Sequence, residues 1–161
     1  MLNSKKETYL TILFLFSFTI LLIAYAIQYI LGYQPCNLCI VERIPYALTL
    51  IILILYYFTK KDLLFYSVLL MLIFTFSFLI SAYHLGIEQG LIKESNICEA
   101  KNIELIEKEE LLKSFEKINV SCKDVTFKIF DLSLTTYNMI ISIFMFLIST
   151  KIYLISNGFK K

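Results

Sequence analysis

Residues 44–85 read IPYALTLIILILYYFTKKDLLFYSVLLMLIFTFSFLISAYHL. The stretch consists of two apolar runs, residues 44–59 and 63–85, which are separated only by Lys60-Lys61-Asp62. A helix needs about 20 mostly apolar residues to cross about 30 Å of hydrocarbon. Two such runs joined by three polar residues predict a helical hairpin that crosses a membrane twice.

Two further apolar runs, residues 8–31 and 134–155, flank this hairpin. The first is longer than the core of about 7–15 residues in a signal peptide and lacks a small-residue cleavage site, so we expect it to be retained. Together the four runs predict an all-α membrane protein, a four-helix bundle that forms a single domain over residues 1–161.

The composition of the whole chain agrees with this interpretation. Of the 161 residues, 58% are hydrophobic and 17% are charged, and the mean hydropathy is +0.74. Soluble domains have about 45–50% apolar and about 25% charged residues. DNA-binding proteins and ordinary cytoplasmic enzymes are therefore excluded, and no nucleic-acid partner is expected.

The distribution of charge predicts the orientation. The N-terminal tail, the Lys60-Lys61-Asp62 turn and the C-terminal end hold seven basic and two acidic residues, whereas residues 86–132 hold seven lysines and ten acids. Basic residues favour the cytoplasmic side. We therefore expect both termini in the cytoplasm, and two outward loops at about residues 32–38 and 86–132.

All four cysteines lie on the outward side: Cys36 and Cys39 in the connection of residues 32–43, and Cys98 and Cys122 in residues 86–132. Disulfides persist outside the cytosol and are rare within it. One interpretation is that two structural disulfides brace the loops. The other is a redox relay between two cysteine pairs.

The stretch PCNLCIVER, residues 35–43, contains a Cys-x-x-Cys pair. A bridge within it would close a very small ring and stabilise little, whereas exchange chemistry depends on thiolate stability and access. The spacing therefore favours redox activity. A metal site is the weaker interpretation and none is expected, because the only histidine, His84, and the other cysteines lie far away in the sequence.

Residues 44–59 alone are short for a crossing, but a helix that begins at Cys39 has about 21 residues and a length of about 31 Å. Cys39 would then lie at the helix N-terminus, with Arg43 one turn later on the same face. Both features would favour a thiolate. The charged pair Glu42 and Arg43 at the membrane edge suggests function, although Arg43 could also simply extend to the headgroups.

The long outward loop contains a second signal between Cys98 and Cys122. Apolar residues in 104–118 approximate one helical face, which predicts a short amphipathic helix on the membrane surface or on the end of the bundle. Taken alone, a Cys98–Cys122 bridge is consistent with a purely structural disulfide. His84, near the outward end of the third run, fits either an interfacial histidine or a hydrogen-bond donor to a cofactor.

Three stretches resemble one known family: PCNLCIVER at 35–43, YHLGIE at 83–88 and CKDVTFKIFDLSLTTYN at 122–138. They are similar to the motifs of the disulfide bond formation protein B (DsbB) family, the thiol:quinone oxidoreductases of the bacterial inner membrane. The likeness follows the chain in order over nearly its whole length. It departs in two places: Phe127 stands where the family often has tryptophan, and Asp131 replaces a usual glycine, which leaves the turn before the fourth helix open.

The resemblance implies a role for each cysteine. The pairs would be Cys36–Cys39 and Cys98–Cys122. Cys98 would be attacked by a reduced periplasmic DsbA-like oxidase of the thioredoxin fold, which would free Cys122 to exchange with Cys36. Cys39 would become the thiolate that contacts a quinone.

The resemblance also implies a cofactor-binding group. Arg43 would hold the quinone, either ubiquinone or menaquinone, beside Cys39. His84 would assist at the quinone ring, and Glu42 would belong to the same cofactor-binding group. The protein would lie in the inner membrane with its cysteines on the periplasmic side and pass electrons to the quinone pool.

Three alternatives stay open at this point. One is a DsbI-type paralogue that serves a dedicated partner. The second is a protein similar to vitamin K epoxide reductase, although the Cys-x-x-Cys of that family falls in the last helix and here the pair precedes the second. The third is a non-catalytic membrane protein with two structural disulfides.

Overall fold

The computed structural model describes residues 2–60, 62–94, 98, 121–123 and 127–158. The elements, in chain order, are α1 (Leu2–Tyr29), α2 (Asn37–Val41), α3 (Ile44–Thr59), α4 (Leu63–Glu88), β1 (Lys128–Ile129), β2 (Leu132–Ser133) and α6 (Leu134–Gly158). The amphipathic helix expected within residues 104–118 lies outside the described residues.

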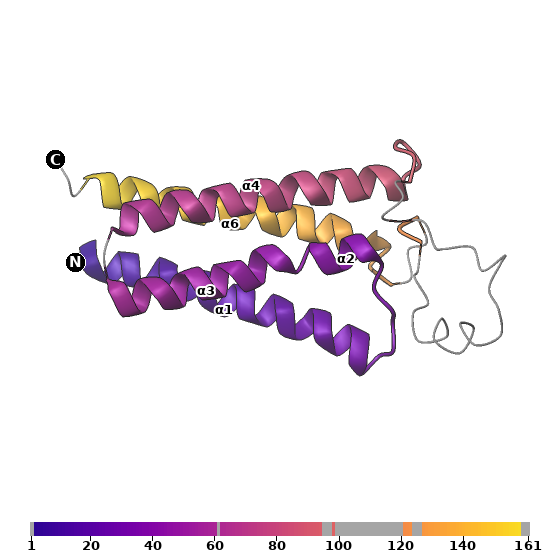
Figure 1. The fold of residues 1–161 in the computed structure, drawn as a ribbon, viewed down its shortest axis with the longest axis horizontal. Coiled ribbons are helices and arrows are strands. Elements are labelled where there is room, and N and C mark those ends of the chain that lie inside the picture. The colour runs from indigo at the N-terminus through magenta and orange to yellow at the C-terminus, as the bar shows by residue number, and fades with distance from the viewer. Residues whose placement is uncertain (1, 61, 95–97, 99–120, 124–126, 159–161) are drawn as a thin grey trace, which may run out of the picture.

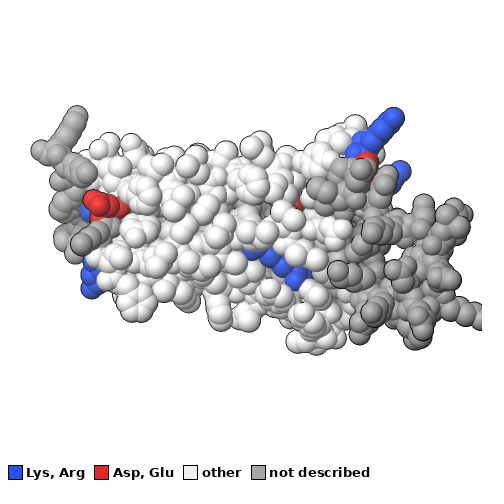
Figure 2. All heavy atoms as spheres, viewed as in Figure 1, with Lys and Arg blue, Asp and Glu red and all other residues white. Residues whose placement is uncertain are grey.

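The predicted fold class is confirmed. Four helical segments are long and apolar enough to cross a membrane: Lys6–Tyr29, Asn37–Thr59, Leu63–Glu88 and Leu134–Gly158. In Figure 1 both chain ends lie at one end of the bundle, and α2 lies at the other. Figure 2 shows a largely uncharged surface along the helices, with most charged atoms toward the two ends. The protein is a multi-pass membrane protein.

The α4–α6 pair and the α1–α3 pair are held together by different kinds of contact. The most extensive helix pair is α4 with α6, and buried serines lie in both helices, such as Ser77 and Ser142, whose hydroxyl oxygens are 2.8 Å apart. Small residues let two helices approach closely in lipid, where apolar side chains gain little from meeting one another. By contrast, α1 packs mainly on α3 through apolar side chains such as Leu13 and Leu53.

The second span is not the continuous helix expected over residues 39–59. It consists of α2 and α3, which are separated at Glu42 and Arg43. Pro45, the second residue of α3, has no N–H to donate, and its ring would clash with the carbonyl one turn earlier. The break therefore follows from Pro45, and it places the charged pair at a joint rather than within a helix.

A β-hairpin, which the sequence did not predict, precedes α6. Strands β1 and β2 are antiparallel, with Ile129 opposite Leu132. The two residues between them, Phe130 and Asp131, have φ values of 49° and 61°. Positive φ at both central positions is typical of a type I′ turn, which suits the twist of a hairpin. Asp131 thus takes the left-handed conformation that the usual glycine would adopt easily.

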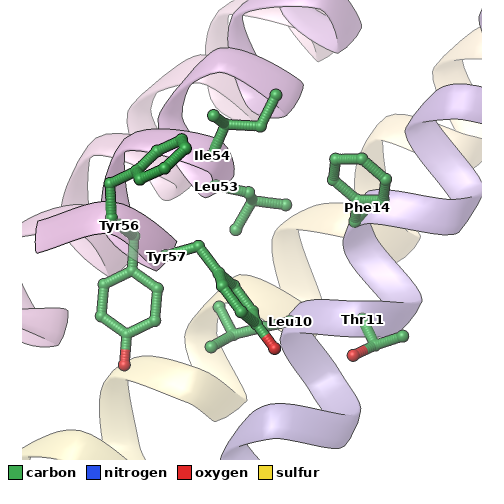
Figure 3. A pocket seen from close by; sticks show the side chains of 8 residues that line it. Leu10, Thr11, Phe14, Leu53, Ile54, Tyr56 and Tyr57 are labelled. Carbon is green, nitrogen blue, oxygen red and sulfur yellow. The ribbon is translucent and has the colours of Figure 1, made fainter. Parts of the chain in front are cut away.

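An apolar cavity of about 390 Å³ lies between α1 and α3, lined by Leu10, Phe14 and Leu53 among others (Figure 3). It contains no cysteine and no charged side chain, and its lining residues lie toward the end of the bundle opposite α2. The cysteines and the buried Glu42 and His84 lie instead at the α2 end of the bundle.

Candidate active site

The Cys-x-x-Cys pair lies at the start of α2. Cys36 is the N-cap residue, with an extended backbone, and its Sγ accepts a hydrogen bond from the backbone N–H of Cys39 at 3.1 Å. The expected position is therefore corrected: α2 begins at Asn37, Cys36 is its N-cap, and Cys39 lies within its first turn. The capping sulfur receives a main-chain donor because α2 starts one residue after it.

All four cysteines pack together. Cys36, Cys98 and Cys122 are only 5%, 2% and 2% exposed, and they form one buried cluster with Leu38 and Ile87, against which Cys39 packs. Cys98 and Cys122 are joined in a disulfide. Cys36 and Cys39 are free thiols.

The Cys36–Cys39 disulfide that was expected from the resemblance is therefore not formed in this structure. The pair is in its dithiol form, with Cys36 Sγ accepting the Cys39 N–H. A pair that cycles between thiols and a disulfide must pass through this form.

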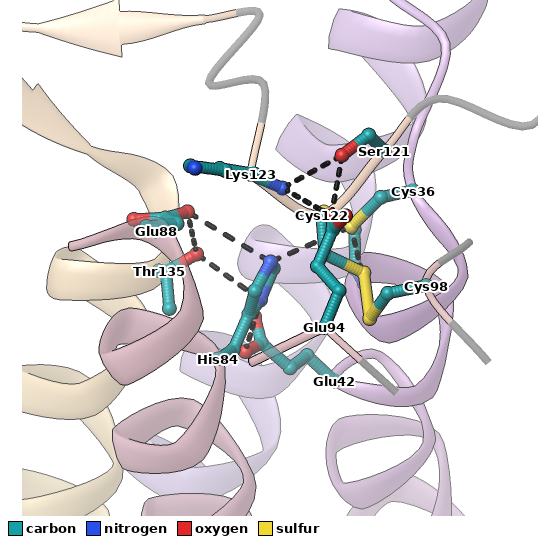
Figure 4. The surroundings of a disulfide bond; sticks show 11 residues. Cys36, Glu42, His84, Glu88, Glu94, Cys98, Ser121, Cys122, Lys123 and Thr135 are labelled. Carbon is teal, nitrogen blue, oxygen red and sulfur yellow. Dashed lines mark hydrogen bonds and ion pairs between the residues drawn. A yellow bond between two sulfur atoms is a disulfide. The ribbon is translucent and has the colours of Figure 1, made fainter. Parts of the chain in front are cut away.

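His84 connects the pair to two buried carboxylates (Figure 4). Its Nε2 lies 3.5 Å from Cys36 Sγ and its Nδ1 lies 3.0 Å from Glu42 Oε1. A carboxylate beside Nδ1 favours the tautomer in which Nδ1–H donates to Glu42. Nε2 is then left as an acceptor that faces the Cys36 thiol.

A second carboxylate reaches the same histidine from its own helix. Thr135 Oγ1 donates a hydrogen bond to Glu88 Oε1 at 2.6 Å and lies 3.2 Å from His84 Nδ1. Glu88 Oε1 is also 3.8 Å from His84 Nε2. His84 is 1% exposed, so this group of polar side chains is held away from water by α4 and α6.

The hydrogen bonds of Cys36 stabilise its thiolate. The pKa of Cys36 is lowered to about 5, first because the Cys39 side chain hydrogen-bonds to it and then because His84 does so and adds positive charge. Burial acts in the opposite direction. In the dithiol form, the favoured position of negative charge is therefore Cys36, whereas the sequence pointed to Cys39.

A cavity of about 320 Å³ opens beside Cys39, between α1, α3 and α6. Most of its lining is apolar, from residues such as Ile20, Ala24 and Phe127. Its polar lining includes Glu42, Arg43, Tyr46, Thr135 and Asn138. Tyr46 donates a hydrogen bond to Asn138 Oδ1, and Asn138 donates to Ser81 Oγ at 2.7 Å, so the polar residues on this wall are fixed by one another.

Arg43 is held by two residues that sequence reasoning missed. Its Nη1 donates a hydrogen bond to Gln28 Oε1 at 2.6 Å, and its guanidinium lies 5.1 Å from the centre of the Tyr25 ring. Both partners belong to α1. The one available signal was Gln28 itself, an amide within an otherwise apolar run, because polar residues inside membrane helices commonly have a partner.

The disulfide has its own support. Glu94 Oε1 accepts hydrogen bonds from Ser121 Oγ and, at 3.0 Å, from the backbone N–H of Lys123 (Figure 4). These two residues flank Cys122 on either side. Glu94 thus fixes the backbone around Cys122 independently of the S–S bond.

Comparison with known proteins identifies the family of the chain. Residues 6–152 match the family described as disulfide bond formation protein DsbB. The chain belongs to the DsbB family. An uncharacterised protein of Rickettsia prowazekii (strain Madrid E), RP370, is 31% identical over 146 residues, which cover 85% of this chain and 83% of the relative. No solved structure matches the chain.

Membership of the DsbB family makes this chain a membrane protein of disulfide bond formation, with thiol oxidoreductase activity. The fold brings the seven residues selected from the sequence to one end of the bundle. Cys36, Cys39, His84, Glu42 and Arg43 meet around the joint between α2 and α3. Cys98 and Cys122 pack against the first pair.

Proposed function

We propose that the protein reoxidises a periplasmic thiol oxidase of the thioredoxin fold, similar to DsbA, and passes the electrons to a membrane quinone. The observation that carries this proposal is the buried cluster in which two cysteine pairs pack together beside a mostly apolar cavity. Thiol–disulfide exchange requires the attacking sulfur to reach the disulfide, and the cluster keeps the two pairs within one packed group.

In the first exchange, a thiolate of the reduced partner attacks Cys98 Sγ. The Cys98–Cys122 bond breaks, a mixed disulfide forms at Cys98, and Cys122 leaves with the electron pair and takes up a proton. The partner's second thiol then displaces Cys98. The partner becomes a disulfide, and two electrons and two protons remain on Cys98 and Cys122.

In the second exchange, the Cys122 thiolate attacks Cys36 Sγ of an oxidised Cys36–Cys39 pair, the Cys36–Cys39 bond breaks, and Cys39 leaves with the electron pair. Cys98 then attacks Cys122 Sγ, so that the Cys98–Cys122 disulfide forms again and Cys36 leaves. The products are an oxidised Cys98–Cys122 pair, the outer pair, and a reduced Cys36–Cys39 pair, the inner pair. The Cys98–Cys122 bond and the free thiols of Cys36 and Cys39 are compatible with these products.

The inner pair must then lose two electrons and two protons. A bound quinone supplies the acceptor for both. The cavity is suited to a quinone ring in size and in chemistry. Its volume of about 320 Å³ is at the lower end of the range of about 300–1,000 Å³ for ligand pockets, and it combines apolar walls with a few polar groups. Cys39 and Arg43 both line it. Ubiquinone and menaquinone share this chemistry.

His84 and Glu42 handle the proton of Cys36. Nε2 of His84 faces the Cys36 sulfur and is placed to take the thiol proton, while Glu42 at Nδ1 stabilises the imidazolium that results. Glu42 also lines the cavity, so a proton on its carboxyl group lies on the wall beside the acceptor. Arg43, fixed by Gln28, places positive charge on the same wall.

The location follows from the same argument. We place the protein in the bacterial inner membrane with α2 and the disulfide on the periplasmic side, where a thiol oxidase can reach Cys98. The excess of basic residues in the N-terminal tail, the 60–62 turn and the C-terminal end supports a cytoplasmic position for both termini.

The test is quinone-dependent oxidation of a reduced DsbA-like partner by the purified protein, followed by the quinone's absorbance. We expect turnover with the parent protein, none with Cys39→Ser, and parent-like turnover with Tyr57→Phe, a control in the distant cavity. Failure of the parent protein with both quinones and a competent partner would refute the proposal and favour a dedicated partner or two structural disulfides.

A further inference from the structure

The fold brings a third metal-binding side chain, His84, to the Cys36–Cys39 pair. The ligand atoms of Cys36, Cys39 and His84 all lie within 4.8 Å of one another. His84 comes from α4, 48 positions after Cys36. We propose that the protein in its dithiol form binds one Zn²⁺ through Cys36 Sγ, Cys39 Sγ and His84 Nε2.

The geometry suits this ion. Zinc binds thiolate sulfur at about 2.3 Å and imidazole nitrogen at about 2.0–2.1 Å with tetrahedral angles, which sets the S···N edge of the site at about 3.5 Å. The distance from Cys36 Sγ to His84 Nε2 is 3.5 Å. Two of the ligands are therefore already at zinc spacing, and Cys39 Sγ lies within 4.8 Å of both.

The surroundings of the histidine also suit a metal. Zinc-bound histidines almost always donate the other ring N–H to a carboxylate, a backbone carbonyl or water, which fixes the ring and strengthens the ligand. Here Glu42 Oε1 lies 3.0 Å from Nδ1. This contact leaves Nε2, the atom that faces the two sulfurs, free to coordinate.

The charges in the site favour a divalent cation. Two thiolates neutralise Zn²⁺, so binding creates no net charge among buried side chains. Glu88, whose Oε1 is 3.8 Å from His84 Nε2, adds a second carboxylate beside the ion. The nearby cation, Arg43, is directed to Gln28 and Tyr25 of α1.

The cavity provides a route to the site. Of the three ligands, Cys39 lines the cavity, so an ion that enters the cavity meets the Cys39 sulfur first. A fourth coordination position is left for water.

Binding and disulfide formation exclude each other. Binding requires both sulfurs as thiolates and an unprotonated Nε2 on His84, so two protons leave the group formed by Cys36, Cys39 and His84, and the sulfurs cannot form an S–S bond while they hold the ion. Zinc therefore retains the inner pair in its reduced form. Inhibition of turnover is the consequence for the proposed function and rests on it, whereas the binding itself does not.

The test is metal titration of the fully reduced protein in detergent, without oxygen and without quinone. Co²⁺ serves as the spectroscopic probe and Zn²⁺ as its competitor. We expect one equivalent of Co²⁺ to produce sulfur-to-cobalt charge-transfer absorption and tetrahedral d–d bands, which Zn²⁺ abolishes. Two protons should be released for each ion bound.

Variants assign the ligands. Cys39→Ser and His84→Gln should each weaken Zn²⁺ binding at least about tenfold while helicity by circular dichroism is unchanged. The matched control, Cys98→Ser with Cys122→Ser, should keep one tight equivalent. Absence of charge-transfer absorption, loss of the equivalent in the control, or parent-like binding by His84→Gln would overturn the site.

Failure of this inference can be told apart from failure of the proposed function. Zinc-free turnover in a protein that binds no Zn²⁺ would overturn the metal site and leave the oxidoreductase in place. Tight Zn²⁺ binding by a protein without turnover would uphold the site and refute the proposed function. If both are right, Zn²⁺ should inhibit turnover, and a chelator should restore it.

Discussion

The contact between Gln28 and Arg43 gives a prediction whose size can be worked out. Replacing Gln28 by Leu removes the acceptor that lies 2.6 Å from Arg43 Nη1. A hydrogen bond to a charged group contributes about 1.5–3 kcal/mol, and each 1.4 kcal/mol corresponds to about a factor of ten. The Tyr25 ring, 5.1 Å from the guanidinium, stays in place. We therefore expect an increase of about tenfold in the apparent KM for quinone.

The assay is the initial rate of quinone reduction against quinone concentration, with reduced partner in excess. Gln28→Glu keeps an oxygen acceptor at the same position and should have a KM close to that of the parent. Thr19→Ala is a matched control on α1, because the Thr19 hydroxyl bonds only within its own helix, to the Leu15 carbonyl. A KM unchanged in Gln28→Leu, or raised equally in Gln28→Glu, would refute the view that Gln28 positions Arg43.

Two further outcomes are expected. Cys122→Ala removes the Cys98–Cys122 bond that the reduced partner attacks, so turnover should be lost. The free Cys98 thiolate should instead attack the disulfide of the oxidised partner and give a mixed disulfide at Cys98, found by non-reducing gel and mass spectrometry; an adduct on Cys36 would reverse the proposed order of electron flow. His84 lowers the pKa of Cys36, so His84→Gln should move the midpoint of Cys36 alkylation in the reduced protein to higher pH, and only in part because the Cys39 hydrogen bond remains. A midpoint that stays or falls would contradict the role given to His84.

The membrane spans were predictable because apolar composition decides them directly. Runs such as residues 63–85 have few alternatives to a membrane helix once their length approaches the thickness of the hydrocarbon. Helix ends were harder to predict. The second span divides at Glu42 and Arg43 because of Pro45, a local effect that the sequence contained but that an estimate from length alone overlooked. The hairpin before α6 was missed because its strands have only two residues each.

The candidate site was predictable in its residues but not in its contacts. The Cys-x-x-Cys pattern and the family likeness identified Cys36 and Cys39, whereas the proximity of His84 to Cys36 comes from the packing of α4 beside α2 and no spacing encodes it. The expectation of no metal site was based on the distance of His84 along the chain, which does not fix its distance in space: the fold brings the only histidine of the chain to the pair.

The two hydrogen bonds to Glu94 have a consequence for the kinetics of the outer pair. Because Glu94 holds Ser121 and the Lys123 backbone, opening the S–S bond does not release Cys122 into a freely moving loop. Its sulfur keeps a high effective concentration toward the buried thiols around it. The loop-closure entropy that a mobile segment would lose at each cycle is already lost before the partner arrives. Exchange within the protein can therefore compete with attack by outside thiols, and the electrons are directed inward.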